Sequence, residues 1–140
     1  MSSAGEGIIR LSDGTKLKFA IMIIDAKEVG PSPFGGVNID VKVIGGVSTE
    51  FVPEELTEAV KDKPLTPSPP PMEGWELLDI VEQQPPIAEV TIDTTKGKFR
   101  VRVEAEAVMA ARNTNFKTAR NEPIYWVSWV YKISWRPEGR

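Results

Sequence analysis

Apolar and polar residues alternate over much of this chain, which is typical of β-strands with one buried face. The alternation is longest over residues 15–26, where we expect a strand. Its buried face would consist of Leu17, Phe19, Ile21 and Ile23. The opposite face begins with lysines and becomes apolar at Met22 and Ile24, so we expect its far half to be covered as well.

Similar patterns predict further strands joined by short turns. They are expected over residues 8–11, 37–44, 47–52, 87–95, 98–110 and 124–135. Asp13-Gly14 and Lys96-Gly97 are typical of tight hairpin turns. Gly45-Gly46 should end or bend the strand before it. Residues 75–81 fit both helical and strand spacing, and the two prolines that follow favour a strand.

One short helix is expected near residues 53–63, with a proline at its first position and two glutamates in its first turn. Its buried stripe would consist of Leu56, Ala59 and Val60. The proline-rich stretch 64–71 ends this helix and connects two halves of a single domain, residues 1–140. The fold class is therefore α+β and predominantly antiparallel, with about six or seven strands in a twisted sheet or partly open barrel.

Composition narrows the possible chemistry. The chain has 140 residues, 41% of them hydrophobic, which is enough for a core without disulfides. It contains neither cysteine nor histidine. Thiolate metal sites, the usual zinc sites, and mechanisms that rely on Ser-His-Asp or Cys-His are excluded. We therefore expect no enzymatic activity, no cofactor and no metal.

The sequence also bears on membranes. The first residues lack the basic and apolar regions of a signal peptide, and the longest apolar run, residues 19–24, is too short to cross a bilayer. A cytoplasmic protein without membrane contact is expected.

Charge is distributed unevenly along the chain. The formal net charge is −3, but residues 1–95 carry 7 Lys/Arg against 16 Asp/Glu, whereas residues 96–120 carry 7 Lys/Arg against 2 Glu. Such asymmetry bears on the kind of partner more than the total does.

The basic segment includes a strand whose cations share one face. Lys98, Arg100 and Arg102 are two residues apart, so their side chains leave the strand on the same side, and Lys96 in the turn adds to them. Such a row could follow the phosphates of a nucleic acid. The alternative is a solvated face whose cations pair with Glu89 or Asp93 across the hairpin.

A polar loop is expected after this strand, from residue 111 or 112 to residue 123. Its amides, cations and aromatic ring are of the types that contact phosphates and bases. The residues in question are Arg112, Asn113, Phe116, Lys117 and Arg120. The alternative is an ordinary hairpin loop with Phe116 packed into the core.

The register of the last strand decides which aromatic residues are exposed. The more apolar set, from Tyr125 to Trp135 in steps of two, should join the core. Trp126, Lys132 and Arg136 would then lie beside Arg100 and Arg102. In the opposite register Tyr125, Trp129 and Tyr131 would face the arginines.

These features support two functional hypotheses. The first is a small protein that binds single-stranded nucleic acid with low sequence specificity, through the basic strand, the loop and Trp126. The second is a structural or protein–protein interaction subunit of a larger assembly, which includes association with further copies of itself.

Overall fold

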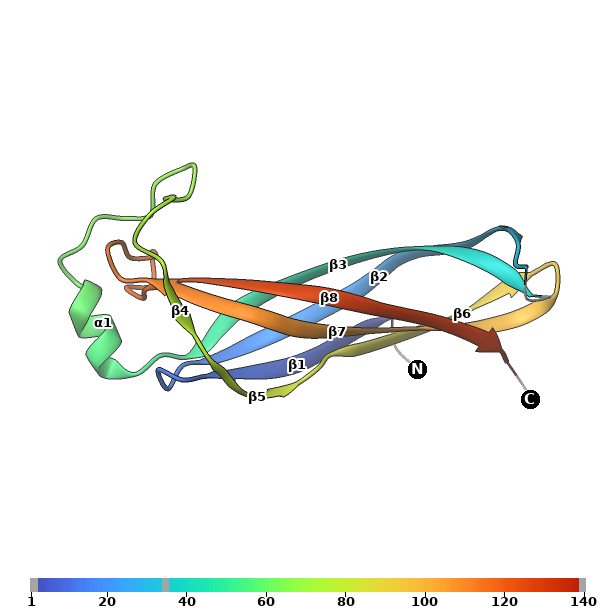
Figure 1. Ribbon diagram of the computed structural model, residues 1–140, viewed down its shortest axis with the longest axis horizontal. Helices are drawn as coiled ribbons and strands as arrows, with labels where there is room; N and C mark the ends of the chain where they lie inside the picture. Colours follow the sequence, from blue (N-terminus) through green and yellow to red (C-terminus); the bar gives the residue numbers. More distant parts are fainter. Residues whose placement is uncertain (1–2, 34–35, 139–140) are drawn as a thin grey trace.

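The strands pair into two facing antiparallel sheets in the computed structural model, which describes residues 3–33 and 36–138 (Figure 1). The described residues form eight strands and one α-helix. In chain order these are β1 (Ala4–Leu11), β2 (Lys16–Pro31), β3 (Val37–Phe51), α1 (Glu54–Val60), β4 (Glu76–Leu78), β5 (Ile80–Gln84), β6 (Ile87–Thr94), β7 (Gly97–Asn113) and β8 (Ile124–Pro137). The predicted predominance of antiparallel strands with one short helix is confirmed, with two sheets that do not close into a barrel.

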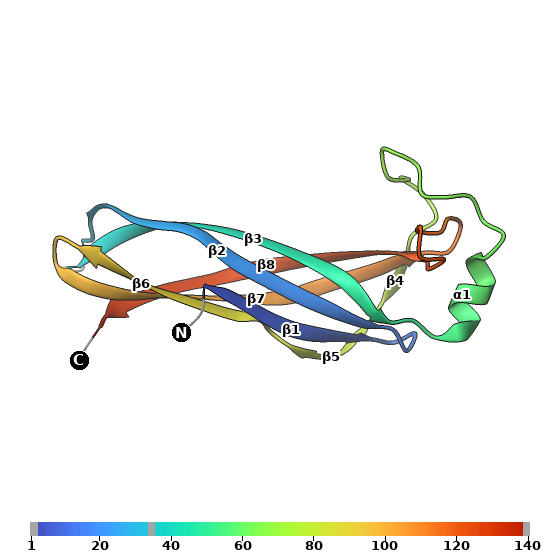
Figure 2. The same cartoon turned by 180° about the vertical axis from the view of Figure 1, so that it is seen from behind.

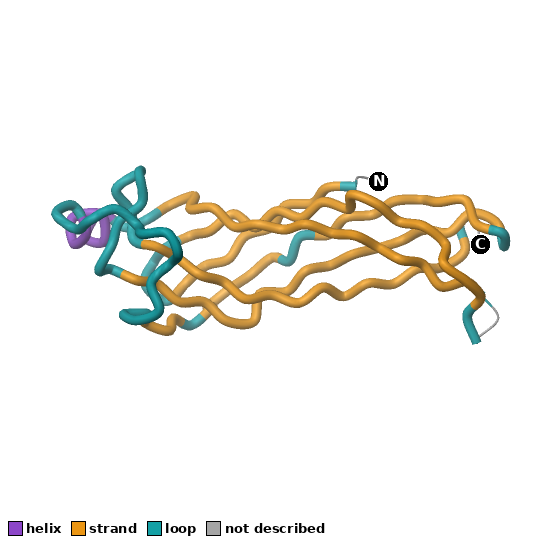
Figure 3. Tube along the Cα trace, turned by 90° about the horizontal axis from the view of Figure 1, so that it is seen from above, coloured by secondary structure: helices purple, strands orange, loops and turns teal. Residues whose placement is uncertain are grey.

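The two sheets differ in how their strands are ordered. Sheet 1 has the order β3-β2-β1-β5. In sheet 2, β7 pairs with β8 on one side, and with β6 and β4 in succession on the other. Because β2, β3, β7 and β8 are long, the sandwich is elongated (Figures 1 and 2). The helix end carries α1 and the loops 61–75 and 114–123 (Figures 1 and 3). The hairpin end carries the turn between β6 and β7 (Figure 1).

One edge of the sandwich is formed by a segment that changes sheets twice. β4 pairs with β7 in sheet 2, β5 pairs with β1 in sheet 1, and β6 returns to β7. At this crossing β1 runs so close to the chain that a Cβ atom on Gly7 would collide with the carbonyl oxygen of Gln84 and the nitrogen of Pro86. Glycine is therefore required in β1, although β-strand propensity disfavours it.

The opposite edge, between β3 and β8, is filled by aromatic side chains. The indole Nε1 of Trp135 donates a hydrogen bond to the carbonyl of Val37, at 2.9 Å. Gly45 makes room for Tyr131, because a Cβ atom at this position would lie 2.6 Å from the Tyr131 hydroxyl. Of the two expectations for Gly45 and Gly46, that they end the strand or bend it, the first is wrong, because both lie inside the continuous strand β3.

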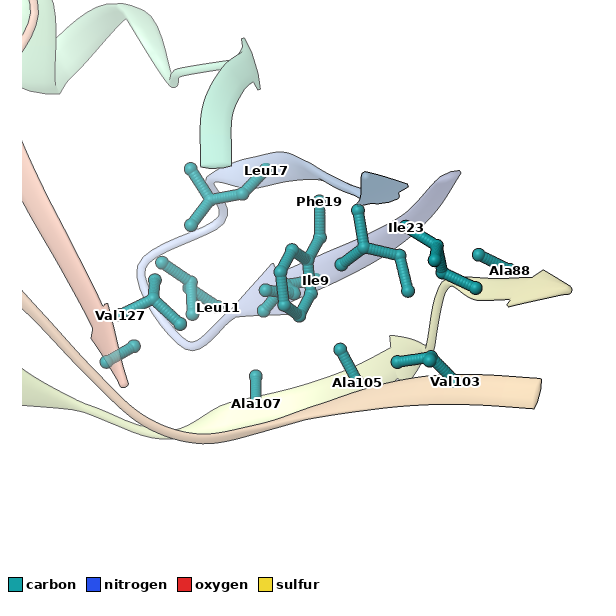
Figure 4. Packing of buried hydrophobic residues seen from close by; sticks show 12 residues of the cluster. Ile9, Leu11, Leu17, Phe19, Ile23, Ala88, Val103, Ala105, Ala107 and Val127 are labelled. Atoms are coloured by element: carbon teal, nitrogen blue, oxygen red, sulfur yellow. The ribbon is translucent and has the colours of Figure 1, made fainter. Parts of the chain in front are cut away.

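The core lies between the sheets and confirms the predicted inner face of β2 (Figure 4). Phe19 and Leu17 are almost fully buried, and Phe19 packs against Trp129 with ring centroids 4.9 Å apart. Small residues of β7, Ala105 and Ala107, allow close packing across from them. Because β1, β2, β6, β7 and β8 all contribute, segments on both sides of the proline-rich stretch build this core.

A bulge changes which residues of β7 face inwards. Before it, Val103 and Ala107 point to the core, and after the register shift between Ala107 and Met109 the inward positions are Ala110 and Arg112. A β-bulge adds one residue to a strand and so reverses its alternation. The strand also continues to Asn113, so the expected loop from 111 or 112 is shorter than predicted.

Three further expectations need correction. Residues 37–51 form one strand where two were expected, and β4 and β5 are separate short strands where one was expected. In the helix Val60 is buried as predicted, but Ala59 is exposed. The outer face of β2 is not covered at Met22 and Ile24, which are 44% and 54% exposed. No helix among the described residues has the length and hydrophobicity that crossing a bilayer requires.

Candidate interaction surface on sheet 2

The outer face of sheet 2 carries most of the charged residues singled out from the sequence. β8 lies in the predicted register, with Val127 and Trp129 packed in the core and Trp126 and Lys132 outside. Arg100 is directly opposite Arg136 on the neighbouring strand, and Arg102 is opposite Ser134. The opposite register, with the tyrosines facing the arginines, is not the one observed.

We call Lys98, Arg100 and Arg102 the basic row. Each of these three cations has an acidic partner. Lys98 Nζ lies 2.8 Å from Asp93 Oδ1 across the hairpin, as expected for a solvated, paired face. Arg100 donates two hydrogen bonds to Glu138, Nη2 to Oε1 at 2.8 Å and Nε to Oε2 at 3.2 Å. Arg102 Nη2 lies 3.5 Å from Glu104 Oε1. The row is therefore a pattern of neutralised pairs and not a track of unpaired positive charge.

These pairs also shift the pKa values of their members. The hydrogen bond from Arg100, assisted by one from the Thr91 hydroxyl, lowers the pKa of the Glu138 carboxyl. The hydrogen bond to Asp93 raises the pKa of Lys98. Each shift favours the charged form, so the pairs stay ionised near neutral pH. Since these groups are exposed, salt weakens their attraction.

Three arginines nevertheless converge at one point of this face. Arg100, Arg102 and Arg136 line a hollow of about 140 Å³ together with Ser134 and Glu89. Among the described residues, Arg136 forms no ion pair. Like charges directly opposite each other on neighbouring strands are destabilising, and Glu138 offsets this repulsion through Arg100.

The other half of the same face, towards the helix end, is apolar. Leu77, Ala111 and Trp126 form a row across β4, β7 and β8. Leu77 is 72% exposed and Trp126 is 46% exposed. We call the exposed residues of this region the apolar end; they are Leu77, Val108, Met109, Trp126 and Val130.

A groove of about 440 Å³ borders the apolar end. Its walls are Pro70, Pro71, Trp75, Leu77, Ala111 and Trp126. The Trp75 indole donates a hydrogen bond to the Pro71 carbonyl at 2.9 Å, which fixes the indole against the proline-rich loop. Two acidic residues, Glu73 and Asp79, are exposed near the groove, and the ion pair of Lys132 with Glu106 lies beside Val130 at the other border of the apolar end.

Two of the predicted contact residues are turned into the protein. Arg112 lies on the inner face of β7, where Nη1 is 3.1 Å from Asp13 Oδ2 and Nε is 3.4 Å from Glu76 Oε1. Asn113 is fully buried; its amide donates to the Glu73 carbonyl, and its Oδ1 accepts from the Asn115 N–H. Both side chains hold the fold together at the helix end. The expectation that they project from a loop is wrong.

Arg112 belongs to a polar cluster that joins the two sheets. The Tyr125 hydroxyl donates to Asp13 Oδ2 at 3.0 Å, and the Thr15 hydroxyl lies 2.6 Å from the Tyr125 hydroxyl. The Asp13 side chain is only 5% exposed. Burial raises the pKa of the Tyr125 phenol, which therefore stays neutral. The sequence indicates only a turn at Asp13. Its role in joining the two sheets depends on partners that are distant in the sequence and is visible only in the structure.

The remaining loop residues lie at the helix end. Lys117 Nζ donates to the Lys61 carbonyl at 2.8 Å, and its backbone pairs with the segment around Leu65. Phe116 is half-buried and Arg120 is exposed. The basic row and Lys96 lie at the hairpin end, so the structure does not bring the predicted residues into one surface. The ten steps from Trp126 to Arg136 in β8 span roughly 34 Å at 3.4 Å per residue.

Comparisons with models of protein families, with curated protein sequences and with solved structures gave no match. Among the described residues, no group of three or more acidic side chains is arranged to hold a metal ion.

Proposed function

We propose that this protein is a non-enzymatic subunit of a larger assembly, and that the apolar end of sheet 2 binds a protein partner. The observation that carries the proposal is the row Leu77, Ala111 and Trp126, with its two outer members exposed. Contiguous apolar surface of this kind is usually covered in a functional state. Tryptophan and methionine are also enriched at protein interfaces.

The charges around the apolar end define the chemistry of the partner. Glu73 and Asp79 are exposed beside it. The complementary surface is apolar and bordered by lysine or arginine, since opposite charges at the rim steer association and reject wrong partners. The groove between Pro71, Trp75 and Trp126 would hold one large apolar side chain of that partner.

A photo-crosslinking amino acid at position 77 tests this proposal in the cells that make the protein. We expect crosslinks to one protein, through a peptide that contains apolar residues and lysine or arginine. The matched control carries the same crosslinker at Ser134, on the charged half of the same face. Purified partner should then bind the native protein and lose at least about tenfold in affinity with Trp126→Ala.

Two outcomes would overturn the proposal. One is equal crosslinking from positions 77 and 134, which would indicate non-specific contact. The other is unchanged affinity of the crosslinked partner for the Trp126→Ala protein, which would place the interface elsewhere.

Binding of single-stranded nucleic acid is the second candidate. It is favoured by one observation, the convergence of Arg100, Arg102 and Arg136 around a small hollow. Arginine binds phosphate through two parallel hydrogen bonds, and phosphate would compete with Glu138 and Glu104 for these guanidinium groups. The paired state of the basic row and its distance from Trp126 rank this candidate second.

Titration with a short single-stranded oligonucleotide at low and at high salt tests the second candidate. Binding through phosphates weakens steeply with salt, and the double variant Arg100→Glu, Arg102→Glu should abolish it. The matched control reverses two lysines on sheet 1, Lys16→Glu and Lys27→Glu, and should leave binding unchanged. Binding that survives the arginine reversals, or no binding at low salt, would exclude this role.

A further inference from the structure

A second exposed apolar region lies in the middle of the outer face of sheet 1, on the opposite side of the molecule from the apolar end. The strands of sheet 1 lie in front in Figure 2. Met22, Ile24 and Ile44 are 44%, 54% and 53% exposed. The lysines of β2 and β3 lie further along the strands, towards the helix end and towards the hairpin end, and none of them lies within this region. The pattern of β2 indicates a strand with two covered faces, but no described part of the chain covers this one.

The surface of this region has a ridge beside a hollow. Met22 is opposite Ile44 on the neighbouring strand, and these long side chains form the ridge with Ile24. One step towards the helix end, Ala20 is opposite Gly46. These small residues leave a hollow of about 440 Å³, which Ala4 and Gly5 of β1 also line.

Charged residues lie on both sides of the ridge and the hollow, and the charge on β2 has the opposite sign on the two sides. Beyond the hollow, Lys18 of β2 lies beside Glu6 of β1, with Nζ 3.3 Å from Oε1. Beyond the ridge, Asp25 of β2 is opposite Lys42 of β3. Along β2 the sequence of surface properties is therefore positive, hollow, ridge, negative.

We propose that a second copy of this chain covers the region. The two-fold axis would lie between the two facing sheets, perpendicular to β2, and would pass over the point between Ala20 and Met22. Such an axis reverses the direction of β2, so the ridge of each copy enters the hollow of the other. It also brings Lys18 opposite Asp25 of the partner subunit, twice per dimer.

Self-complementarity selects a second copy over another protein. Shape and charge both match when the surface is rotated onto itself, and an isologous dimer requires this property. Sheets that pack face to face lie about 10 Å apart, and their side chains interdigitate. A ridge formed by one cross-strand pair of side chains and a hollow formed by the next pair fit this kind of packing. The inference rests on the proposed role as an assembly subunit and adds a defined contact to it, on the opposite face from the apolar end.

Reversing the charge of Lys18 or of Asp25 tests this geometry, because the two residues face each other only across the proposed axis. Sedimentation velocity of the native protein over a range of concentrations should show a monomer–dimer equilibrium. Lys18→Asp and Asp25→Lys should each raise the dimer dissociation constant at least about tenfold, because each places two like-charged contacts across the axis. A mixture of the two variants should recover the native affinity, since both contacts then join an aspartate of one variant to a lysine of the other.

Two further variants control the test. Lys98→Asp makes the same change on sheet 2 and should leave the equilibrium unaltered. Ile44→Lys should abolish the dimer while the far-ultraviolet circular dichroism stays native, because Ile44 is exposed in the monomer.

The outcomes separate this inference from the proposed function. A native protein that is monomeric at all concentrations overturns the two-fold contact, and crosslinking from position 77 still decides on the apolar end. A native dimer that Lys18→Asp leaves intact, or that the mixture of variants does not restore, also overturns the contact while self-association remains.

Discussion

The side-chain amide of Gln83 makes both backbone hydrogen bonds of Ala107. Gln83 Nε2 donates to the Ala107 carbonyl at 2.9 Å, and the Ala107 N–H donates to Gln83 Oε1 at 3.0 Å. At this point none of the described strands neighbours β7 on that side, because β5 has left sheet 2 to pair with β1. A glutamine side chain thus takes the place of a strand and keeps the backbone of β7 satisfied where the chain changes sheets.

Replacing Gln83 should therefore destabilise the protein without altering its surface. Gln83→Ala leaves a partly buried donor and acceptor of Ala107 without partners, which costs about 1–3 kcal/mol. The matched control is Gln84→Ala, because Gln84 is the next residue and its side chain is exposed. Urea denaturation gives the free energy of unfolding of both variants. Equal stability of the two would contradict the bridging role of Gln83.

Gly45 and Gly46 should respond differently to the same substitution. Gly45→Ala places a Cβ atom 2.6 Å from the Tyr131 hydroxyl and 3.3 Å from Trp129, and such overpacking costs about 1–3 kcal/mol. Gly46→Ala meets no described atom within 4 Å and should be neutral or stabilising by about 0.5–1 kcal/mol. Thermal unfolding compares the two at a concentration where both are monomeric. Tyr131→Phe should recover part of the loss in Gly45→Ala, and no recovery would place the strain elsewhere.

The sequence predicts the strands better than it predicts their partners. The alternation in β2 and β8 identifies the buried faces correctly, because one face of each strand is consistently more apolar. The bulge in β7 leaves no trace, since residues 107–111 are all apolar and show no alternation to interrupt. The inward position of Arg112 follows from that bulge and was missed for the same reason.

The candidate surface shows the same limit. The spacing of Lys98, Arg100 and Arg102 predicts a shared face, and the structure has it. The partner of Arg100, however, is Glu138, which follows β8 and reaches the row only because that strand ends beside Phe99. The apolar end was missed because its exposed residues come from three strands. Leu77, Val108 and Met109 fit core positions when their own segments are read alone, whereas the pattern of the last strand places Trp126 outside but beside the arginines.

The cluster around Asp13 should contribute strongly to stability, because the Asp13 side chain is almost fully buried. Asp13→Ala removes the acceptor of the Tyr125 hydroxyl and one partner of the Arg112 guanidinium, and hydrogen bonds to charged groups contribute about 1.5–3 kcal/mol. The matched control is Asp79→Ala, whose backbone bonds with Ser12 survive the change and which should shift stability by less than about 0.5 kcal/mol. Denaturant unfolding measures both. A loss confined to Asp79→Ala would contradict the assignment.

The contact between Glu28 and Thr95 at the hairpin end should make stability depend on pH. The Glu28 carboxylate accepts hydrogen bonds from the Thr95 hydroxyl at 2.6 Å and the Thr95 N–H at 2.8 Å. The first of these lowers the pKa of Glu28 most, and the second assists it. Because the folded-state pKa is below that of the unfolded chain, the contact stabilises the fold fully above the ordinary value of 4.5. This contribution disappears as the pH falls through the folded-state pKa.

Carbon-13 NMR of the Glu28 carboxyl group measures this shift directly. Its titration midpoint should lie below the ordinary glutamate value and move back towards it in Thr95→Ala, where the hydroxyl bond is absent and the backbone N–H bond remains. Glu28→Gln should be less stable than the native protein at neutral pH, and the difference should shrink in acid because the native carboxyl is then neutral too. A difference that stays constant down to about pH 2 would show that the charge of Glu28 does not contribute. The stabilisation would then come from the neutral hydrogen bonds that tie β2 to the β6–β7 turn.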